Sequence, residues 1–451
     1  MAGIPDNAYG QFTGADFPYP EIVLSSGEKV RLDPSGFARV RASAVRADRD
    51  AAFKAFFQAH DAFKGTLGTL LYGQVMTHVF NKDARHYASC VEAALDENAI
   101  PVGVYSALVD SAHAGLPTLH RYLRLRQKMM GLDGLRYEDL YAPAVGSVDL
   151  RYTPEEAMAL TLAAFAPLGK DYVNTLRKGY ESRWVDWYPS KGKRSGAYSE
   201  GAAYDVHPYQ LLNFNGRYTD VSTLAHESGH SMHYFLSNAH QPYVTSEHAT
   251  FVAEVASTLN ENLLFRYMLA NAKDDATRLF LITQRLDGFR QTLFRQTLFA
   301  EFELEAHRMA EAGEPVTGEA LSRLYLDLVR TYYGHREGVC RVDDYCAAEW
   351  AYIHHFWAYN FYVYQYATSL TASTAIARAI RDEAAAAKPS TKTRDAYLGM
   401  LSAGCSKVPI ELLKDVGVDM TTGAPFKAAM DEMNELMDQA EALLAKQPAR
   451  R

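Results

Sequence analysis

The spacing of the apolar residues restricts the fold of this chain more than any other feature. Along most of the 451 residues, large apolar side chains recur at the spacing of a helix with one buried face. Phe53, Phe56, Phe57 and Phe63 show this spacing within residues 51–71. Further helices are expected at residues 105–130, 220–237, 249–271, 275–311, 317–333, 350–385 and 425–446, and after the Thr153-Pro154-Glu155-Glu156 cap. The fold is therefore predicted to be mainly α-helical.

One short region departs from this helical pattern. GKRSGAYS (residues 192–199) is polar and glycine-rich, whereas HPYQLLNF (residues 207–214) is apolar and aromatic. The dipeptide Asn215-Gly216 that follows is a turn signal. These segments predict two or three strands of a small β-sheet directly before the next long helix.

The composition narrows the class of protein. Hydrophobic residues make up 48% of the chain, enough for a large core, which excludes an intrinsically disordered protein. The 46 basic and 54 acidic side chains give a net charge of −8, which argues against a nucleic-acid partner. The sequence has no apolar run near the ~18 residues that cross a membrane, and its first 20 residues show no secretory signal. Because four cysteines do not make a disulfide framework, we expect a cytoplasmic protein with reduced thiols.

The sharpest chemical signal is HESGH at residues 226–230. Residues four apart lie on one face of a helix, so His226 and His230 can present imidazole nitrogens to one metal ion. Glu227 is turned by about 100° from His226, close enough to touch a metal-bound water without being a ligand. His233 does not lie at the spacing of a third histidine ligand, and we expect it to be a buried, hydrogen-bonding or outer-shell residue.

A third ligand is expected on the following helix. Glu254 lies 24 residues after His230, among apolar neighbours, where a carboxylate is costly to bury unless a cation compensates it. Ser257 and Glu261 share its face and could support the ligands. The alternative is that Glu254 pairs with an arginine of a neighbouring helix. With the two histidines, the favoured interpretation is one zinc ion per chain.

A second cluster of polar aromatic residues lies in WAYIHHFWAYNFYVYQYATS, residues 350–369. Tyr359, Tyr362 and Tyr366 are three and four residues apart, which places them on one helical face, and His355 extends that face by one turn. Such a stripe is often core packing, but this many phenols need polar partners if they are buried. A helix beside a wet cleft explains them better, and such groups could donate hydrogen bonds to the oxyanion of a tetrahedral intermediate.

The order of several segments resembles oligoendopeptidase F, a group of the thimet-oligopeptidase-like zinc metallopeptidases. The segments that carry the resemblance are GKRSGAYS, HPYQLLNF, TLAHESGHSMH, FVAEVASTLNE, FRQTLFAEFE and FYVYQYATS. The resemblance covers most of the chain, and implies a helix-rich, zincin-like fold with two lobes around a deep channel that admits short peptides. It also implies His226, His230 and Glu254 as zinc ligands and Glu227 as the catalytic base.

The resemblance extends to the tyrosine cluster. Relatives use a histidine followed by tyrosines to bind substrate and stabilise the oxyanion. Tyr359 and Tyr366 match two of the tyrosine positions, and Tyr362 is a further candidate for substrate binding. Both His354 and His355 fit the histidine position, and His355 is favoured because Phe356 follows it.

The same resemblance suggests a domain organisation. We expect an extended arm at residues 1–20, a helical lobe at residues 21–183 that is short for the family, and a catalytic region at residues 184–451. Relatives usually carry a further N-terminal helical region that this chain is expected to lack.

The expected function is therefore that of a zinc-dependent oligoendopeptidase. Its expected partners are short peptide substrates, with neither nucleic acid nor a membrane, and the sequence leaves the oligomeric state open. One alternative is a carboxypeptidase or dipeptidyl carboxypeptidase, which needs a cation to anchor the C-terminal carboxylate of its substrate. Another is a helical scaffold that has lost catalysis, but the complete ligand set with Glu227 argues against it.

Overall fold

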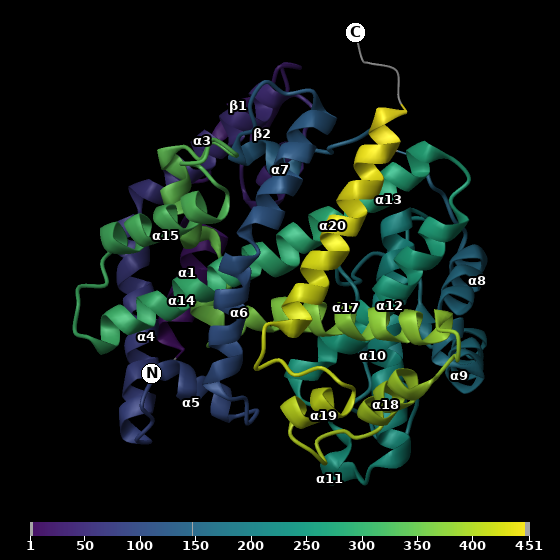
Figure 1. The fold of residues 1–451 in the computed structure, drawn as a ribbon. Coiled ribbons are helices and arrows are strands. Elements are labelled where there is room, and N and C mark those ends of the chain that lie inside the picture. The colour runs from purple at the N-terminus through teal and green to yellow at the C-terminus, as the bar shows by residue number, and fades with distance from the viewer. Residues whose placement is uncertain (1–2, 147, 447–451) are drawn as a thin grey trace. The chain divides into compact units, whose positions relative to one another are not determined.

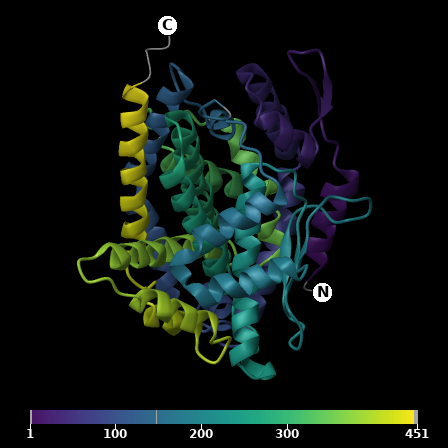
Figure 2. The same ribbon diagram turned by 90° about the vertical axis from the view of Figure 1, so that its right-hand side faces the viewer.

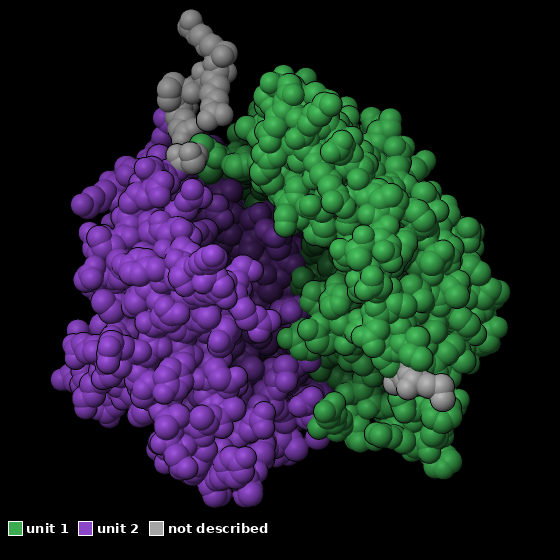
Figure 3. All heavy atoms as spheres, turned by 180° about the vertical axis from the view of Figure 1, so that it is seen from behind, with its two compact units in different colours: residues 1–97, 112–146, 294–364 green, residues 98–111, 147–293, 365–451 purple. Residues whose placement is uncertain are grey.

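The computed structural model describes residues 3–146 and 148–446 of the chain (Figure 1). It is mainly helical, as the apolar spacing predicts. The chain divides into two compact units, coloured separately in Figure 3, and each unit is assembled from three separated stretches. Unit 1 comprises Met1–Glu97, Ala112–Gly146 and Phe294–Tyr364, and unit 2 comprises Asn98–Ser111, Ser147–Leu293 and Gln365–Arg451.

Unit 1 consists of helices and one two-stranded antiparallel sheet. Its elements are α1 (Ile4–Gln11), η1 (Phe12–Asp16), β1 (Glu21–Val23), β2 (Lys29–Arg31), α2 (Pro34–Arg41), α3 (Arg46–Ala62), α4 (Lys64–Ala84), α5 (Cys90–Asp96), α7 (Leu116–Met130), η2 (Tyr137–Tyr141), α14 (Arg295–Glu311), α15 (Gly318–Tyr332), η5 (Asp344–Tyr352) and α16 (His355–Ala358). The helix α6 (Val102–Ala114) begins in unit 2 and ends in unit 1.

Unit 2 contains the small sheet and the long helices that follow it. Its elements are α8 (Pro154–Ala164), η3 (Ala166–Leu168), α9 (Lys170–Glu181), β3 (Val185–Asp186), β4 (Tyr198–Glu200), β5 (Tyr209–Leu211), α10 (Tyr218–His240), α11 (Tyr243–Ser246), α12 (Thr250–Asn271), α13 (Asp275–Gly288), η4 (Phe289–Phe294), α17 (Tyr364–Ala385), α18 (Lys392–Leu401), α19 (Pro409–Asp415) and α20 (Ala424–Ala445). Within this unit α20 packs along α13 (Figure 1 and Figure 2). No helix in the described part of the chain is long and apolar enough to cross a membrane.

The start of α8 forms as its sequence predicts. The backbone N–H of Glu156 donates to Thr153 Oγ1 at 3.2 Å, and the N–H of Thr153 donates to Glu156 Oε2 at 2.8 Å. Pro154 occupies the first turn, where its missing N–H costs nothing. This reciprocal cap satisfies two donors that the first turn of a helix otherwise leaves free.

The predicted small sheet is present and is anchored to α10. Its strand order is β3-β5-β4, with β5 parallel to β3 and antiparallel to β4. The central strand carries Gln210, a buried side chain whose amide donates to Ser231 Oγ on α10 at 2.8 Å. Ser199 of β4 bonds to the same hydroxyl at 2.7 Å. The sheet therefore fixes the helix that carries the HESGH motif.

The prediction of an extended arm at residues 1–20 is wrong, because residues 4–16 are helical. Proline lies in the first turn of α1, where it favours a helix. Tyr9 is buried within unit 1, stacks on Trp357 with ring centroids 3.9 Å apart, and donates to the carbonyl of Ala351 at 3.1 Å. These contacts order a segment whose composition alone resembles a loop.

The prediction of a single helix at residues 350–385 is also wrong. The helix α16 ends at Ala358, the next residue, Tyr359, has an extended backbone, and α17 begins only at Tyr364. Between them Phe361 has a left-handed backbone with φ of 49°. Its N–H donates to Oε1 of the buried Glu303 at 2.7 Å instead of to a helical carbonyl. This hydrogen bond stabilises a break that the spacing of the tyrosines does not reveal.

Candidate metal centre

A close approach of α10 and α12 within unit 2 brings the candidate ligands together. Gly229, inside the HESGH motif, permits the approach: a Cβ atom at this position would lie 2.5 Å from the carbonyl oxygen of Ala256 and 2.6 Å from Cα of Ser257. The buried Asn260 ties the two helices further, since its amide donates to the carbonyl of Ala225 at 3.3 Å. The two helix backbones are thus held nearly in contact beside the motif.

His226, His230 and Glu254 converge as the sequence predicts. Their nearest ligand atoms all lie within 4.8 Å of one another. Oε2 of Glu254 is 3.4 Å from Nε2 of His226 and 3.6 Å from Nε2 of His230. Within residues 3–146 and 148–446, the ion-pair partners of Glu254 are these two histidines, so the alternative of an arginine partner is wrong. Two imidazole nitrogens and one carboxylate oxygen are a ligand set that zinc accepts.

Neighbouring side chains orient these ligands. The hydroxyl of Ser257 donates to Oε2 of Glu254 at 2.8 Å, and Thr258 donates to the backbone carbonyl of the same residue at 2.5 Å. Nδ1 of His226 lies 3.1 Å from Oε1 of Glu261, which leaves Nε2 to face the other ligands. A carboxylate on the far nitrogen fixes the orientation of a ligating imidazole and raises its basicity. Ser257 and Glu261 thus make direct contacts with the candidate ligands, as a supporting role requires.

The pKa values of the two histidines are shifted in opposite directions. Burial alone would lower the pKa of His226, but the hydrogen bond to Glu261 and the charges of Glu261 and Glu254 raise it to about 9. Burial and the charge on His226 lower the pKa of His230 to about 4. The carboxylates around His226 therefore stabilise a positive charge there, while the imidazole of His230 stays neutral. A divalent cation meets both conditions, because it can displace the proton of His226 and bind the free nitrogen of His230.

Glu227 lies beside the ligands on α10 without joining them. Its side chain is buried, and Oε2 has no hydrogen-bond partner among the described residues. Burial raises the pKa of Glu227 to about 7, against the charge of His226 and together with the charges of Glu254 and Glu261. A carboxyl group at this position can accept a proton when it is ionised and return it when it is protonated, and a bound cation would lower its pKa.

Replacing Gly229 by Ala is expected to separate the two helices. The added methyl group would overlap the backbone of α12, and we expect a loss of about 3 kcal/mol in the free energy of unfolding. Urea denaturation of the metal-free protein measures this loss. The matched control is Gly288→Ala on α13, where an added Cβ meets nothing within 4 Å and the helix should gain up to about 1 kcal/mol. Equal unfolding midpoints for the two variants would contradict the close packing.

The tyrosine and histidine candidates fall in both units. Tyr366 is a half-buried residue of α17 in unit 2, the unit that contains the ligands. His355, Tyr359 and Tyr362 lie in unit 1, where the rings of Tyr359 and Tyr362 stack at 5.0 Å and the ring of His355 lies 5.7 Å from that of Tyr359. They do not share one helical face, but the break after α16 still gathers these three rings. His354, also in unit 1, has its Nε2 3.6 Å from a carboxylate oxygen of Asp6.

His233 is buried but does not form the expected hydrogen bonds. Both of its ring nitrogens lack a partner within the described residues, and its ring stacks on that of His248 at 3.6 Å. The stacking partner was not predicted because His248 lies beyond the end of α10. The role of Gly229 was also not predicted, although a glycine inside a helix is a signal of close packing.

Comparison with known proteins places the chain among peptidases. The sequence pattern of peptidase family M3 matches residues 40–432. The chain is 42% identical to the oligopeptidase PepF of Bacillus subtilis over 446 residues, which are 99% of this chain and 65% of that relative. It is 36% identical to an oligoendopeptidase F homolog of Lactococcus lactis, covering 98% of this chain and 72% of the relative. The chain thus spans about two thirds of the length of such relatives, and their names confirm the resemblance to oligoendopeptidase F.

Solved structures show the same fold. The crystal structure of oligoendopeptidase-F from Enterococcus faecium superposes with a TM-score of 0.78 at 32% identity, covering 99% of this chain and 73% of that one. A Chlamydophila abortus protein superposes with a TM-score of 0.90 at 36% identity, covering 98% of this chain and 72% of that one. The helix-rich fold with its small sheet is therefore shared with these proteins, whereas the deep channel stays a prediction.

Proposed function

The chain belongs to peptidase family M3, and from this premise we propose that it is a zinc-dependent endopeptidase that hydrolyses short peptides. The observation that carries the proposal is the convergence of His226, His230 and Glu254, with the buried Glu227 beside them. These three side chains would hold one zinc ion per chain. When bound, the ion would supply Lewis acidity toward the scissile carbonyl and acidify a water molecule.

The surrounding residues of the chain have distinct roles in this proposal. Glu227 takes the proton of the attacking water and later delivers it to the leaving amine. Glu261 holds the His226 imidazole in the orientation that exposes Nε2, and Ser257 holds the Glu254 carboxylate. Such preset geometry lowers the entropic cost of reaching the transition state.

The tyrosine cluster supplies hydrogen-bond donors in the same proposal. Tyr366 and His355 are assigned to the oxyanion, toward which donors must point as charge develops. Tyr359, Tyr362 and His354 are assigned to the substrate backbone. The assignments rest on the resemblance and on the hydroxyl and imidazole groups that these residues offer. The helical lobe at residues 21–183 and the catalytic region at residues 184–451 belong to the proposal as well.

Replacing Tyr366 by Phe tests the oxyanion assignment. Losing one donor that acts only in the transition state should lower kcat about 100-fold and leave KM nearly unchanged. The steady-state kinetics of a fluorogenic peptide measure this split. The control is Tyr397→Phe, which removes a hydroxyl from the buried core of the same unit and should keep kcat within about twofold. Unchanged turnover in the Tyr366 variant would return that residue to a packing role.

Digestion of a peptide library, read by mass spectrometry with and without a chelator, tests the function itself. Cleavage inside peptides blocked at both ends, lost with the chelator and restored by zinc, is the expected result. Removal of residues only from free C-termini would favour the carboxypeptidase alternative. If no peptide is cut and elemental analysis finds no stoichiometric zinc, the chain is a scaffold instead.

A further inference from the structure

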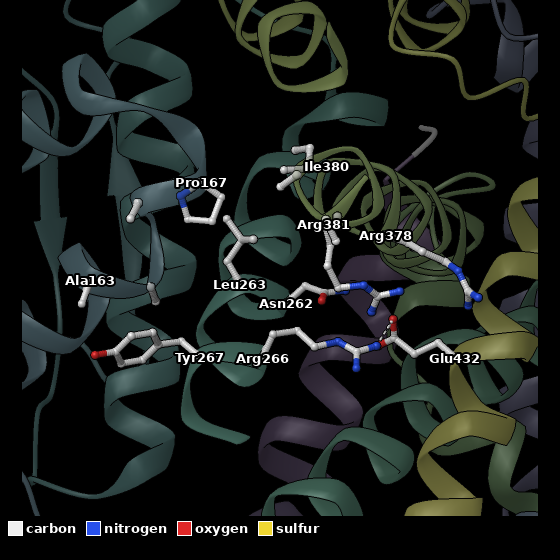
Figure 4. Close-up of a pocket in the computed structure, with 15 residues that line it drawn as sticks. Ala163, Pro167, Asn262, Leu263, Arg266, Tyr267, Arg378, Ile380, Arg381 and Glu432 are labelled. Carbon is white, nitrogen blue, oxygen red and sulfur yellow. Dashed lines mark ion pairs between the residues drawn. The ribbon is translucent and has the colours of Figure 1, made fainter. Parts of the chain in front are cut away.

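A second site lies in unit 2, in a cavity of about 530 Å³ between α8, η3, α12, α17 and α20 (Figure 4). None of the described lining residues is a candidate zinc ligand. Much of the wall is apolar, with Leu263, Ile380 and Pro167 among small alanines. The volume is in the usual range for pockets that bind small molecules. An adjoining cavity of about 560 Å³ shares Arg266 and Arg381 with it.

Cationic groups gather at one end of this cavity. In Figure 4 the side chains of Arg266, Arg378 and Arg381 extend to the side where Glu432 lies, away from Ala163. Three arginines and one glutamate line the wall, so the lining carries 3 − 1 = +2 charges. The apolar wall and the cationic end together give the cavity an amphipathic character.

Each of these arginines has an acidic partner, and of these partners among the described residues only Glu432 lines the cavity. Glu432 already compensates two cations: its Oε2 lies 2.8 Å from Arg266 and its Oε1 lies 3.3 Å from Arg285. Glu435, 2.7 Å from Arg378, does not line the cavity, and neither does Asp382, an exposed residue 3.1 Å from Arg381. An exposed ion pair of this kind contributes little, so a ligand can compete for the guanidinium.

An unsatisfied polar side chain lies between the apolar wall and the arginines. Asn262 is 1% exposed, and its Nδ2 has no hydrogen-bond partner in the part of the chain that the structure describes. Nη1 of Arg378 is likewise buried without a hydrogen bond among those residues. Buried donors without partners are costly, and native proteins usually satisfy them. Both residues line the cavity, but these two nitrogen atoms are closed off from solvent, so the recognition of a ligand rests on the other nitrogens of the arginines.

We propose that this cavity binds a small carboxylate that carries an apolar body. The carboxylate lies against Arg378 and Arg381, and the apolar body covers Leu263 and Ile380. Guanidinium groups favour carboxylates because their paired N–H donors match the two oxygens. Two sources offer this chemistry: a free fatty acid of medium length, and an apolar peptide that ends in a free C-terminal carboxylate.

Isothermal titration calorimetry of the full chain with octanoate tests the charge recognition. We expect octanoate to bind with a Kd of about 100 µM, and 1-octanol, which has the same chain without the charge, to bind at least about tenfold more weakly. The peptide source is tested with acetyl-Leu-Leu and its C-terminal amide in the Glu227→Gln background, which blocks the proposed hydrolysis. Tighter binding of the peptide acid than of its amide identifies the peptide source. Tighter binding of octanoate than of 1-octanol identifies the fatty acid.

Two kinds of variant locate the binding site. The double variant Arg378→Met/Arg381→Met removes the cations, and Ala384→Trp, at an exposed lining position, fills the cavity without disturbing the core. Each should weaken the ligand that binds by about tenfold or more. The matched control is Arg177→Met, which removes an exposed cation of α9 outside the cavity and should leave the Kd within about twofold.

The outcome does not depend on the proposed peptidase activity, because the calorimeter reads binding alone. Octanoate or peptide-acid binding that is lost in both kinds of variant supports the proposal, whether or not the chain cuts peptides. Three results would overturn it: charge-independent binding in both pairs (octanoate with octanol, and the peptide acid with its amide), binding that either kind of variant leaves unchanged, or no binding of either acid at millimolar concentration.

Discussion

The Glu227→Gln variant is expected to bind zinc as the wild-type chain does and to lose about 10³-fold in kcat. Glutamine has nearly the same shape, so the helix and the three ligands beside it should stay in place. Its amide cannot accept the proton of water, so the proposed base is lost. Zinc content by elemental analysis and kcat on a blocked peptide, measured on the same preparation, separate metal binding from catalysis.

The control for this variant is Glu181→Gln, the same change at an exposed position of α9. It should leave both zinc content and kcat unchanged. Near-normal cleavage by the Glu227 variant would show that another group is the base. A loss of zinc together with activity would show that Glu227 supports the metal rather than the proton transfer.

The Glu254→Ala variant is expected to lose stoichiometric zinc and, with it, detectable peptide cleavage. The remaining two histidines offer one ligand fewer than catalytic zinc sites usually provide. Competition with a chromogenic chelator measures the change in zinc affinity. Ser257→Ala provides a graded comparison, since it removes only the hydroxyl that holds the Glu254 carboxylate, and should weaken zinc binding about 10-fold to 100-fold.

Glu247→Ala, at an exposed position before α12, is the control for both variants and should leave zinc affinity unchanged. Full zinc occupancy in the Glu254 variant would remove that residue from the ligand set. In the metal-free chain the Glu254 carboxylate lies close to two imidazoles, so removing it should not prevent folding. Circular dichroism checks that the variant folds.

The parts of the fold and site that follow local rules could be predicted from the sequence. Helical spacing places His226 and His230 on one face, and the apolar neighbours of Glu254 identify a carboxylate that needs a cation. The cap at Thr153 also forms from residues three apart. In each case the deciding contacts join residues close in the chain, or follow from the cost of burying a charge.

The parts that depend on distant contacts could not be predicted. The break after α16 rests on a hydrogen bond from Phe361 to Glu303, 58 residues away in the chain. The helix at residues 4–16 is ordered by the packing of Tyr9 on Trp357. Gly229 could have been recognised as a packing position, but the helix that it meets was not evident from the motif alone. Spacing within one segment contains no information about such partners.

The interleaving of the two units has a consequence for how the chain folds during synthesis. Unit 1 needs residues up to 364, and unit 2 needs α20, so neither unit can be completed on the ribosome until most of the chain has been made. The helices α10 and α12, by contrast, leave the ribosome one after the other and can pair early, since their contact is local. The nascent chain can therefore bring the three candidate ligands together before either unit is complete.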